Sequence, residues 1–368
     1  MSYGTDTFAQ KKRIREHGIE VGVLKTGENN AITDVKGVTI GQVTIKKGKN
    51  IRTGVTAIIP HQGDLYNRKV PAAIYIGNGY GKLAGYSQVK ELGNIETPVV
   101  LTNTLSVPRA ADALLSYTLD QEGHENIRSV NAVVGETNDG YLNDIRGRHI
   151  EEKDVLEALS KATDGSVEEG TVGAGTGTMC FGYKGGIGTS SRILPLTAGG
   201  YTVGVLVQTN FGGVLEIAGV PIAKELGNYP YEGAYEDNGS ADGSCMIVVI
   251  TDAPLDSRNL ERLAKRAMLG LGKTGGIASN GSGDYVIALS VNPEVLIDET
   301  EDSDLTGKQV LKNEAMTPLF LATIEATEEA ILNSLFMAET IEGREGHKAE
   351  ELPVKKVLRI MKQYNRIK

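Results

Sequence analysis

Unbroken apolar runs along the chain predict the strands of a buried core. The clearest runs cover 201–208 and 245–250, with others at 54–60, 71–77, 98–102, 130–135 and 285–290. Short runs rich in β-branched residues are typical of strands buried on both faces. Residues 32–40 instead alternate around a glycine, which predicts short strands joined by a turn.

Apolar residues at helical spacing predict helices between these strands. The segments are 84–92, 109–121, 152–162, 256–269 and 317–341. Asp256 or Ser257 is the expected N-cap of its helix, and Gly270 is the expected stop. Pro318 predicts a helix start because proline favours the first helical position. The basic tail from Lys355 predicts a last strand or helix.

Glycine content and charge narrow the class of protein. The chain of 368 residues contains 46 glycines and no tryptophan, which suits an α/β protein with many tight loops. Segment 170–188 is so rich in glycine that it predicts a loop. The net charge of −9 argues against nucleic-acid binding. No low-complexity linker divides the chain, so we expect a single domain over 1–368.

The N-terminal residues, the length of the apolar runs and the number of cysteines indicate the cellular compartment. The first 18 residues are polar and basic, unlike a secretory signal, and no apolar run approaches the ~18 residues that span a bilayer. Two cysteines, Cys180 and Cys245, suggest a reducing compartment, so we expect a cytoplasmic protein. The five histidines are scattered, so no metal site and no cofactor is predicted.

The chain changes character abruptly at Ser244. Residues 238–243 are small or polar, whereas an apolar strand follows from Cys245. Cleavage of the Gly243–Ser244 bond would give Ser244 a free α-amine, which titrates near ~7.7–8.0 and can accept the proton of the hydroxyl. Gly243 permits the strained backbone that such a cleavage needs. The alternative is an ordinary loop residue at the start of a strand.

Other reactive patterns are weaker. Residues 173–177 (GAGTG) lack the spacing of a dinucleotide fingerprint. Gly272-Lys273-Thr274 resembles the end of a phosphate-binding P-loop, but it follows a predicted helix rather than a strand. No G-x-S-x-G elbow is present. Cys245 could be a nucleophile, but in an apolar strand a small core residue is the favoured interpretation.

Three further side chains could assist Ser244. Ser282 and Asp284 precede a strand that could pair with 245–250, where they could orient Ser244 and hold its protonated amine. Asn210 ends another predicted strand, and its amide could donate a hydrogen bond to an oxyanion. Each of these residues is also common in ordinary turns.

An ordered set of motifs extends over nearly the whole chain. Its segments are 30–37 (NAITDVKG), 52–56 (RTGVT), 96–104 (ETPVVLTNT), 135–144 (GETNDGYLND), 173–177 (GAGTG), 243–244 (GS), 251–255 (TDAPL), 280–284 (NGSGD), 325–332 (EATEEAIL) and 346–347 (GH). Together they resemble the self-cleaving N-terminal-nucleophile aminopeptidases, which comprise the L-aminopeptidase/D-amidase/D-esterases and the β-peptidyl aminopeptidases.

This resemblance implies a fold and a processing event. The implied fold is a four-layer αββα sandwich, like that of N-terminal-nucleophile hydrolases but with different strand connectivity. Self-cleavage would yield chains of 1–243 and 244–368. A tetramer of these two-chain protomers is the assembly that the family suggests.

The resemblance also implies roles for single residues. Ser244 would be the nucleophile, Ser282 and Asp284 would tune it, and Asn210 would serve the oxyanion hole. Glu136 would bind the free amino group of the substrate. Asn138 stands where some relatives carry an aromatic residue, and Tyr141 could supply an aromatic wall instead.

The resulting hypothesis is a serine aminopeptidase that acts on a small peptide, amide or ester, without nucleic-acid or membrane partners. Two alternatives stay open. One is a related self-processing acyltransferase of the ornithine acetyltransferase type, although those use threonine as the nucleophile. The other is an uncleaved homologue that binds small molecules without catalysis.

Overall fold

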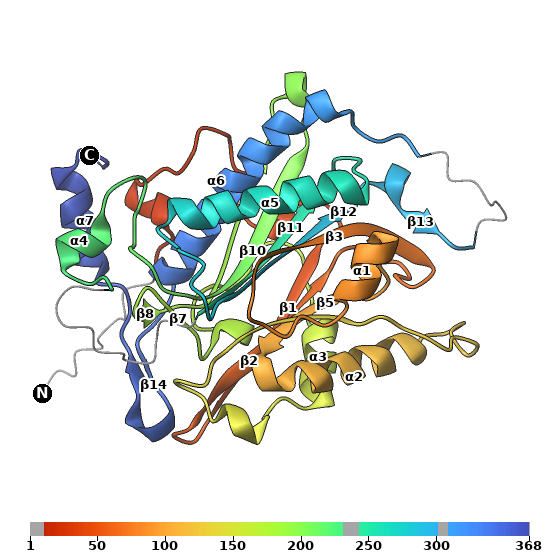
Figure 1. Ribbon diagram of the computed structural model, residues 1–368, viewed down its shortest axis with the longest axis horizontal. Coiled ribbons are helices and arrows are strands. Elements are labelled where there is room, and N and C mark those ends of the chain that lie inside the picture. Colours follow the sequence, from red (N-terminus) through yellow and green to blue (C-terminus); the bar gives the residue numbers. More distant parts are fainter. Residues whose placement is uncertain (1–10, 231–242, 301–307, 368) are drawn as a thin grey trace, which may run out of the picture.

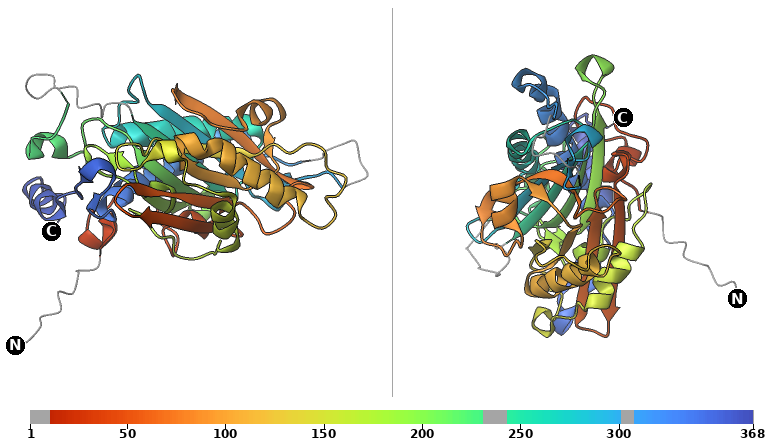
Figure 2. Two further views of the ribbon diagram at one scale, coloured as in Figure 1. Left: turned by 90° about the horizontal axis from the view of Figure 1, so that it is seen from below. Right: turned by 90° about the vertical axis from the view of Figure 1, so that its right-hand side faces the viewer.

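A computed structural model describes residues 11–230, 243–300 and 308–367. Within these ranges two β-sheets pack face to face, and helices cover the outer face of each (Figure 1, Figure 2). The result is the expected four-layer αββα sandwich. The polar stretch before Gly243, at 231–242, and much of the acidic segment 298–304 lie outside the described residues.

The smaller sheet has four strands in the order β1-β2-β5-β6. Only the β5–β6 pair is parallel among them. Helices α2 and α3 cover this sheet. The bounds are β1 Thr39–Lys47, β2 Ile51–Ile59, β5 Val99–Asn103, β6 Val133–Thr137, α2 Val107–Leu119 and α3 Glu152–Ser160.

The larger sheet has seven strands, and its main path runs β13-β3-β12-β11-β10-β9, with β4 paired to β3. Strands β11 and β12 are parallel, and the other pairs on this path are antiparallel. Helices α5 and α6 cover it. The bounds are β3 Arg68–Gly79, β4 Asn94–Ile95, β9 Ile187–Ile193, β10 Thr202–Asn210, β11 Ser244–Thr251, β12 Gly283–Ser290, β13 Ile297–Asp298, α5 Ser257–Lys273 and α6 Met316–Phe336.

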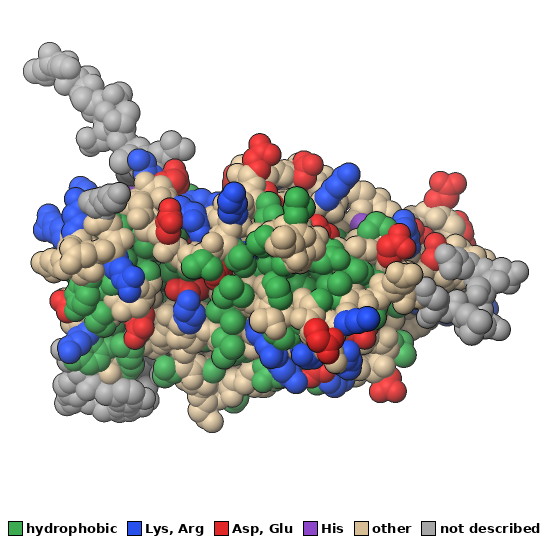
Figure 3. Space-filling view, turned by 90° about the horizontal axis from the view of Figure 1, so that it is seen from above, with side chains coloured by type: hydrophobic (Ala, Val, Ile, Leu, Met, Phe, Trp, Pro, Cys, Tyr) green, Lys and Arg blue, Asp and Glu red, His purple; other side chains and the backbone are tan. Residues whose placement is uncertain are grey.

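Smaller elements lie around the sandwich. Helix α1 follows β3, helices α4 and α7 pack together, and two short hairpins complete the set. Their bounds are α1 Tyr86–Leu92, α4 Ile222–Leu226, α7 Val354–Gln363, β7 Met179–Cys180, β8 Tyr183–Lys184, β14 Ile341–Glu342 and β15 Lys348–Ala349. On the face seen in Figure 3, hydrophobic side chains gather across the middle, and many of the charged ones lie toward the margins.

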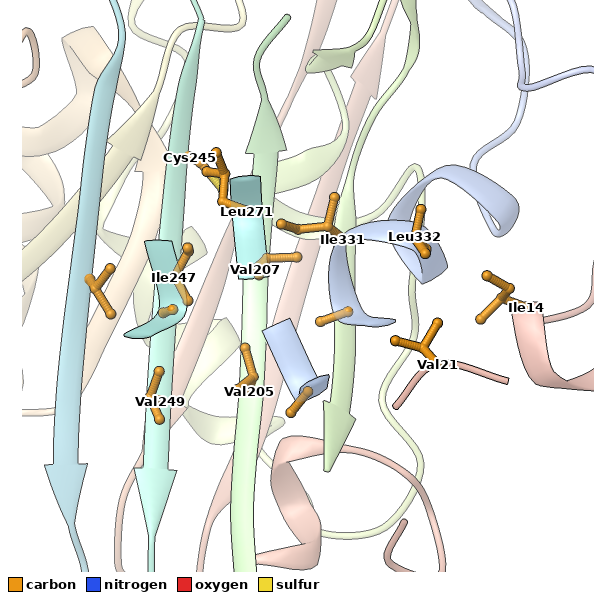
Figure 4. Packing of buried hydrophobic residues seen from close by; sticks show 14 of the residues in the cluster. Ile14, Val21, Val205, Val207, Cys245, Ile247, Val249, Leu271, Ile331 and Leu332 are labelled. Carbon is orange, nitrogen blue, oxygen red and sulfur yellow. The ribbon is translucent and has the colours of Figure 1, made fainter. Parts of the chain in front are cut away.

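The central strands are apolar throughout because both of their faces are buried. In β11, Ile247 and Val249 point toward α5 and α6 (Figure 4), whereas Met246 and Val248 point toward the smaller sheet. Cys245 is fully buried on the helix side, as its interpretation as a core residue requires. Alternate residues of one strand therefore belong to two separate cores.

Several boundaries differ from the expectations. Residues 32–34 form a 3-10 helix rather than a strand, since Asp34 accepts hydrogen bonds from the Asn29 and Ala31 amides. Gly270 does not end its helix, because α5 continues to Lys273. A Cβ at Gly270 would lie 2.7 Å from the Ile324 carbonyl oxygen, so this glycine allows α5 and α6 to pack closely.

Other segments also depart from the expected pattern. Segment 170–188 is not a loop throughout, because it contains the β7–β8 hairpin and the start of β9. Helix α6 begins at Met316, so Pro318 is its third residue, and it ends at Phe336, five residues early. The basic tail forms a helix, α7, and Asp256 is the N-cap of α5 as expected.

A buried ionic cluster ties the first described residues to α6. Arg192 of β9 is fully buried and pairs with Glu325 at 3.1 Å and with Glu329 at 2.7 Å. Arg15 pairs with the same Glu329 at 2.7 Å. Opposite charges hold the pKa of Glu329 below its usual range against the opposing effect of burial. Segments from both sides of Ser244 thus share one ion-pair cluster.

Candidate active site

Ser244 is the first residue of β11, in the middle of the larger sheet. It lies opposite Asn210, the last residue of β10, and opposite Gly283, the first residue of β12. Three strand ends therefore meet at this serine, and their pairing fixes its backbone. The Ser244 Oγ accepts a hydrogen bond from the Gly283 amide at 3.3 Å.

Gly243 fits its position only because it has no side chain. A Cβ there would lie 2.3 Å from the Phe211 Cα and 2.5 Å from the Asn210 carbonyl oxygen. The Gly243 carbonyl oxygen accepts a hydrogen bond from the Gly283 amide at 3.2 Å. The same amide therefore serves both this carbonyl and the neighbouring Ser244 hydroxyl.

Asn210 presents the donor half of its side chain to the site. Its Oδ1 accepts a hydrogen bond from the Met179 amide at 2.9 Å. Because this oxygen is engaged, the NH2 group is the part of the carboxamide that is offered to a ligand. A donor at this place, next to the serine, suits a developing oxyanion.

Asp284 of β12 lies on the opposite face of the larger sheet from the Ser244 hydroxyl. It pairs in register with Cys245, whose side chain points toward the helices. Burial raises the pKa of Asp284 to about 6, and the nearby Ser282 hydroxyl and Cys245 amide partly oppose this rise. Within the described residues, no hydrogen bond of good geometry reaches the Ser282 Oγ or the Asp284 carboxylate. Asp284 therefore faces the backbone at 244–245 and not the hydroxyl.

Glu136 comes from the other sheet. It lies near the end of β6 and is 3% exposed. Its Oε1 accepts a hydrogen bond from the Lys82 amide at 2.9 Å, and its Oε2 accepts one from the Thr104 hydroxyl. Burial raises the pKa of Glu136, whereas these two donors oppose the rise. The result is an oriented carboxylate that can receive a cation.

A cavity of about 300 Å³ joins these groups. Ser244, Asn210, Glu136, Asn138 and Tyr141 all line it, whereas Ser282 and Asp284 do not. The remaining lining residues are Tyr80, Lys82, Thr104, Met179, Gly182, Phe211, Gly212, Gly243 and Gly281. Its size would suit a small molecule, and its lining residues come from both sheets.

Tyr141 is held at this cavity by a distant segment. Its ring stacks on the His347 imidazole, with ring centroids 4.5 Å apart and planes 10° apart. His347 Nδ1 also lies 2.8 Å from the Tyr141 carbonyl oxygen. The β14–β15 hairpin thus shapes one wall, which is consistent with Tyr141 as the expected aromatic wall.

Sequence reasoning missed Thr104, Lys82 and Met179. Each reaches the site from a different part of the chain. Thr104 ends the motif 96–104 and Met179 lies in the glycine-rich segment 170–188, but neither pattern assigns the single residue a role. No group of three or more His, Cys, Asp or Glu side chains that could hold a metal ion occurs in the described part of the chain. Every helix in that part is too short or too polar to cross a bilayer.

Comparison with known proteins places this geometry in a family. The profile of peptidase family S58 matches residues 30–349. A β-peptidyl aminopeptidase, BapA, from Sphingosinicella microcystinivorans is 39% identical over 98% of this chain and 94% of its own. The chain therefore belongs to peptidase family S58.

Solved structures agree with this assignment. The PH0078 protein from Pyrococcus horikoshii OT3 is 47% identical over 96% of this chain and 100% of its own, with a TM-score of 0.88. The L-aminopeptidase D-Ala-esterase/amidase from Ochrobactrum anthropi is 33% identical, covers 97% and 100%, and also has a TM-score of 0.88. The latter structure is described as a variant of the Ntn-hydrolase fold, and this chain shares that fold.

Proposed function

We propose that this protein is a self-processing serine aminopeptidase that releases small N-terminal residues from peptides, amides or esters. The observation that carries the proposal is the arrangement at the start of β11. There the Gly283 amide binds the Gly243 carbonyl oxygen beside the Ser244 hydroxyl. An activated carbonyl next to a hydroxyl nucleophile is what an intramolecular acyl shift requires.

Self-processing would proceed through an ester. The Ser244 Oγ attacks the Gly243 carbonyl carbon, and the carbon–nitrogen bond breaks as the Ser244 nitrogen takes up a proton. Water then hydrolyses the ester, which leaves a carboxylate on Gly243 and a free amine on Ser244. The Gly283 N–H stabilises the oxyanion that forms in the first step.

The same serine would then act on substrates. The Glu136 carboxylate binds the substrate ammonium, and the freed amine of Ser244 takes the hydroxyl proton as the Oγ attacks the first carbonyl carbon. Asn210 stabilises the oxyanion, the leaving amine departs with a proton, and an acyl-enzyme remains. Water attacks this ester and releases the amino acid. The chain needs no cofactor for these steps.

The buried glutamate supports aminopeptidase action in particular. A substrate ammonium placed in this cavity would meet an oriented carboxylate, and so a free N-terminus would gain binding energy that a blocked one would lack. The assembly of two-chain protomers into a tetramer and the cytoplasmic location stay predictions.

Mass spectrometry of the purified, denatured protein tests the self-processing. We expect two species whose masses correspond to 1–243 and 244–368. A panel of aminoacyl p-nitroanilides with L-, D- and β-residues then ranks the substrates. A single uncut chain that persists on prolonged incubation, with no amidase turnover, would contradict the proposal and favour a binding protein.

A pH profile tests the role of Asp284. The pKa of this buried carboxyl is raised to about 6, so it is protonated below that pH and charged above it. This value belongs to the uncut chain, and an ammonium beside the carboxylate would lower it. If the carboxylate holds the freed amine of Ser244, kcat/KM should therefore show a second acidic limb at or below about pH 6, beneath the limb set by the amine itself. In Asp284→Asn the acidic limb assigned to Asp284 should be absent, and activity should be low at every pH. An unchanged acidic limb in this variant would argue against the role.

A further inference from the structure

A lysine with no part in the mechanism above is buried within the glycine-rich segment 170–188. Lys184 ends β8 and is fully buried. Its Nζ donates hydrogen bonds to the Gly175 carbonyl oxygen at 2.8 Å and to the Gly185 carbonyl oxygen at 2.6 Å. Both acceptors belong to the backbone of the glycine-rich segment 170–188, so this ammonium joins two parts of that segment.

The segment that Lys184 holds is bonded directly to the end of β10. The Met179 amide donates to Asn210 Oδ1 at 2.9 Å, and the Phe181 amide donates to the Phe211 carbonyl oxygen at 2.8 Å. The Gly186 amide donates to the Thr209 hydroxyl at 3.1 Å. The orientation of the Asn210 carboxamide therefore depends on where this segment places the Met179 amide.

Lys184 connects the two sides of the β7–β8 hairpin. Thr178 accepts a hydrogen bond from the Gly185 amide at 3.1 Å, and its hydroxyl donates to the Gly175 carbonyl oxygen at 3.1 Å. Gly175 and Gly185 flank the β7–β8 hairpin, and both bind the Lys184 ammonium. Without that ammonium, two buried carbonyl oxygens would lose a donor and the hairpin would lose its fixed base.

Stability alone does not explain a lysine here. The charges that act on Lys184 include the repulsive Lys46 and the attractive Asp139, and burial lowers the pKa of Lys184 to about 7. An ammonium buried without a paired carboxylate is costly, and an apolar side chain would avoid that cost. A neutral amine still donates hydrogen bonds, so the contact with the carbonyls survives deprotonation.

We propose that Lys184 is a positioning residue that sets the β7–β8 hairpin so that Asn210 presents its NH2 group to the oxyanion. This inference rests on the proposed function. Lys184 touches neither substrate nor Ser244, and it acts through the Met179 amide. Its loss should therefore weaken stabilisation of the tetrahedral state while leaving binding of the substrate ammonium at Glu136 unchanged.

The test compares Lys184→Met with the wild type. The matched control is Lys161→Met, at an exposed lysine that follows the last residue of α3. Turnover is counted per cleaved chain. We expect kcat to fall about 10- to 100-fold in Lys184→Met, with KM within about two-fold, because removal of a whole oxyanion donor costs about 10²–10³. Lys184→Gln, which is shorter but still donates, should lie between.

An inhibitor separates positioning from general damage. An aminoacyl aldehyde forms a tetrahedral adduct with a serine hydroxyl, so its affinity should fall by the same factor as kcat. A kcat within two-fold of the wild type in Lys184→Met would overturn the inference, as would an unchanged aldehyde affinity beside a reduced kcat. If Lys184→Met does not fold, the same two readouts on Lys184→Gln decide.

Ser244→Ala, assayed in parallel, separates the two hypotheses. Turnover that survives in Ser244→Ala overturns the proposed function, and this inference with it. An inactive Ser244→Ala beside a fully active Lys184→Met overturns the inference alone.

Discussion

Ser244→Ala is expected to give a single uncut polypeptide with at least about 10⁴-fold lower aminopeptidase turnover. Alanine has no hydroxyl, so neither the Gly243 carbonyl nor a substrate carbonyl can be attacked. The fold should persist, since Ser244 occupies the end of a strand that is held by its backbone on both sides. Intact mass and turnover of an aminoacyl p-nitroanilide measure the two effects on one preparation.

A matched control for this variant is Ser160→Ala, an exposed serine at the end of α3. It should be cut and active like the wild type. Ser244→Cys retains a nucleophile at the same place, so some self-cleavage should remain. A Ser244→Ala protein that is both cut and active would end the serine mechanism.

Glu136→Gln is expected to lower kcat/KM for substrates with a free amine by roughly 30- to 1000-fold, because a buried ammonium would lose its charged partner, worth about 2–4 kcal/mol. The amide is the same size as the carboxyl and can still accept the hydrogen bond from the Lys82 amide. Self-cleavage should therefore continue, since that step involves no substrate ammonium. Steady-state kinetics and intact mass together report both results.

Substrates with a blocked amine sharpen this prediction. An N-acetylated p-nitroanilide should be a poor substrate of the wild type, and Glu136→Gln should narrow the difference between the free and the blocked compound. Glu342→Gln, an exposed glutamate of β14, is the control and should keep the wild-type preference. If Glu136→Gln and the wild type have equal kcat/KM for substrates with a free amine, Glu136 does not bind the substrate ammonium.

The strands were predictable because their signal is local. Runs such as 245–250 are apolar on both faces, and the two cores on either side of β11 explain why. The expected place of Ser244, at the first position of a strand, agrees with the structure. The predicted strand 130–135 stops one residue before Glu136, whereas β6 extends to Thr137 and includes it.

The rest of the site depends on contacts that no local pattern records. Thr104 and Lys82 bind Glu136 from other segments, and Met179 orients Asn210 across a sheet edge. Glycine often ends a helix, so the sequence predicts a stop at Gly270, but the role of this residue is set by the close approach of α6. Tertiary packing decides such positions, and a single sequence does not reveal it.

The strand order of the larger sheet has a consequence for refolding. Strands β11 and β12 lie between β10 on one side and β3 on the other, so a cut before Ser244 would leave pieces of two polypeptides interleaved in one sheet. The Arg192 cluster would join the same two pieces. The fragments would stay together in the native state, yet once denatured they would have to meet again in solution. Recovery would become second order in protein concentration, and the cut form would be kept folded by its slow unfolding.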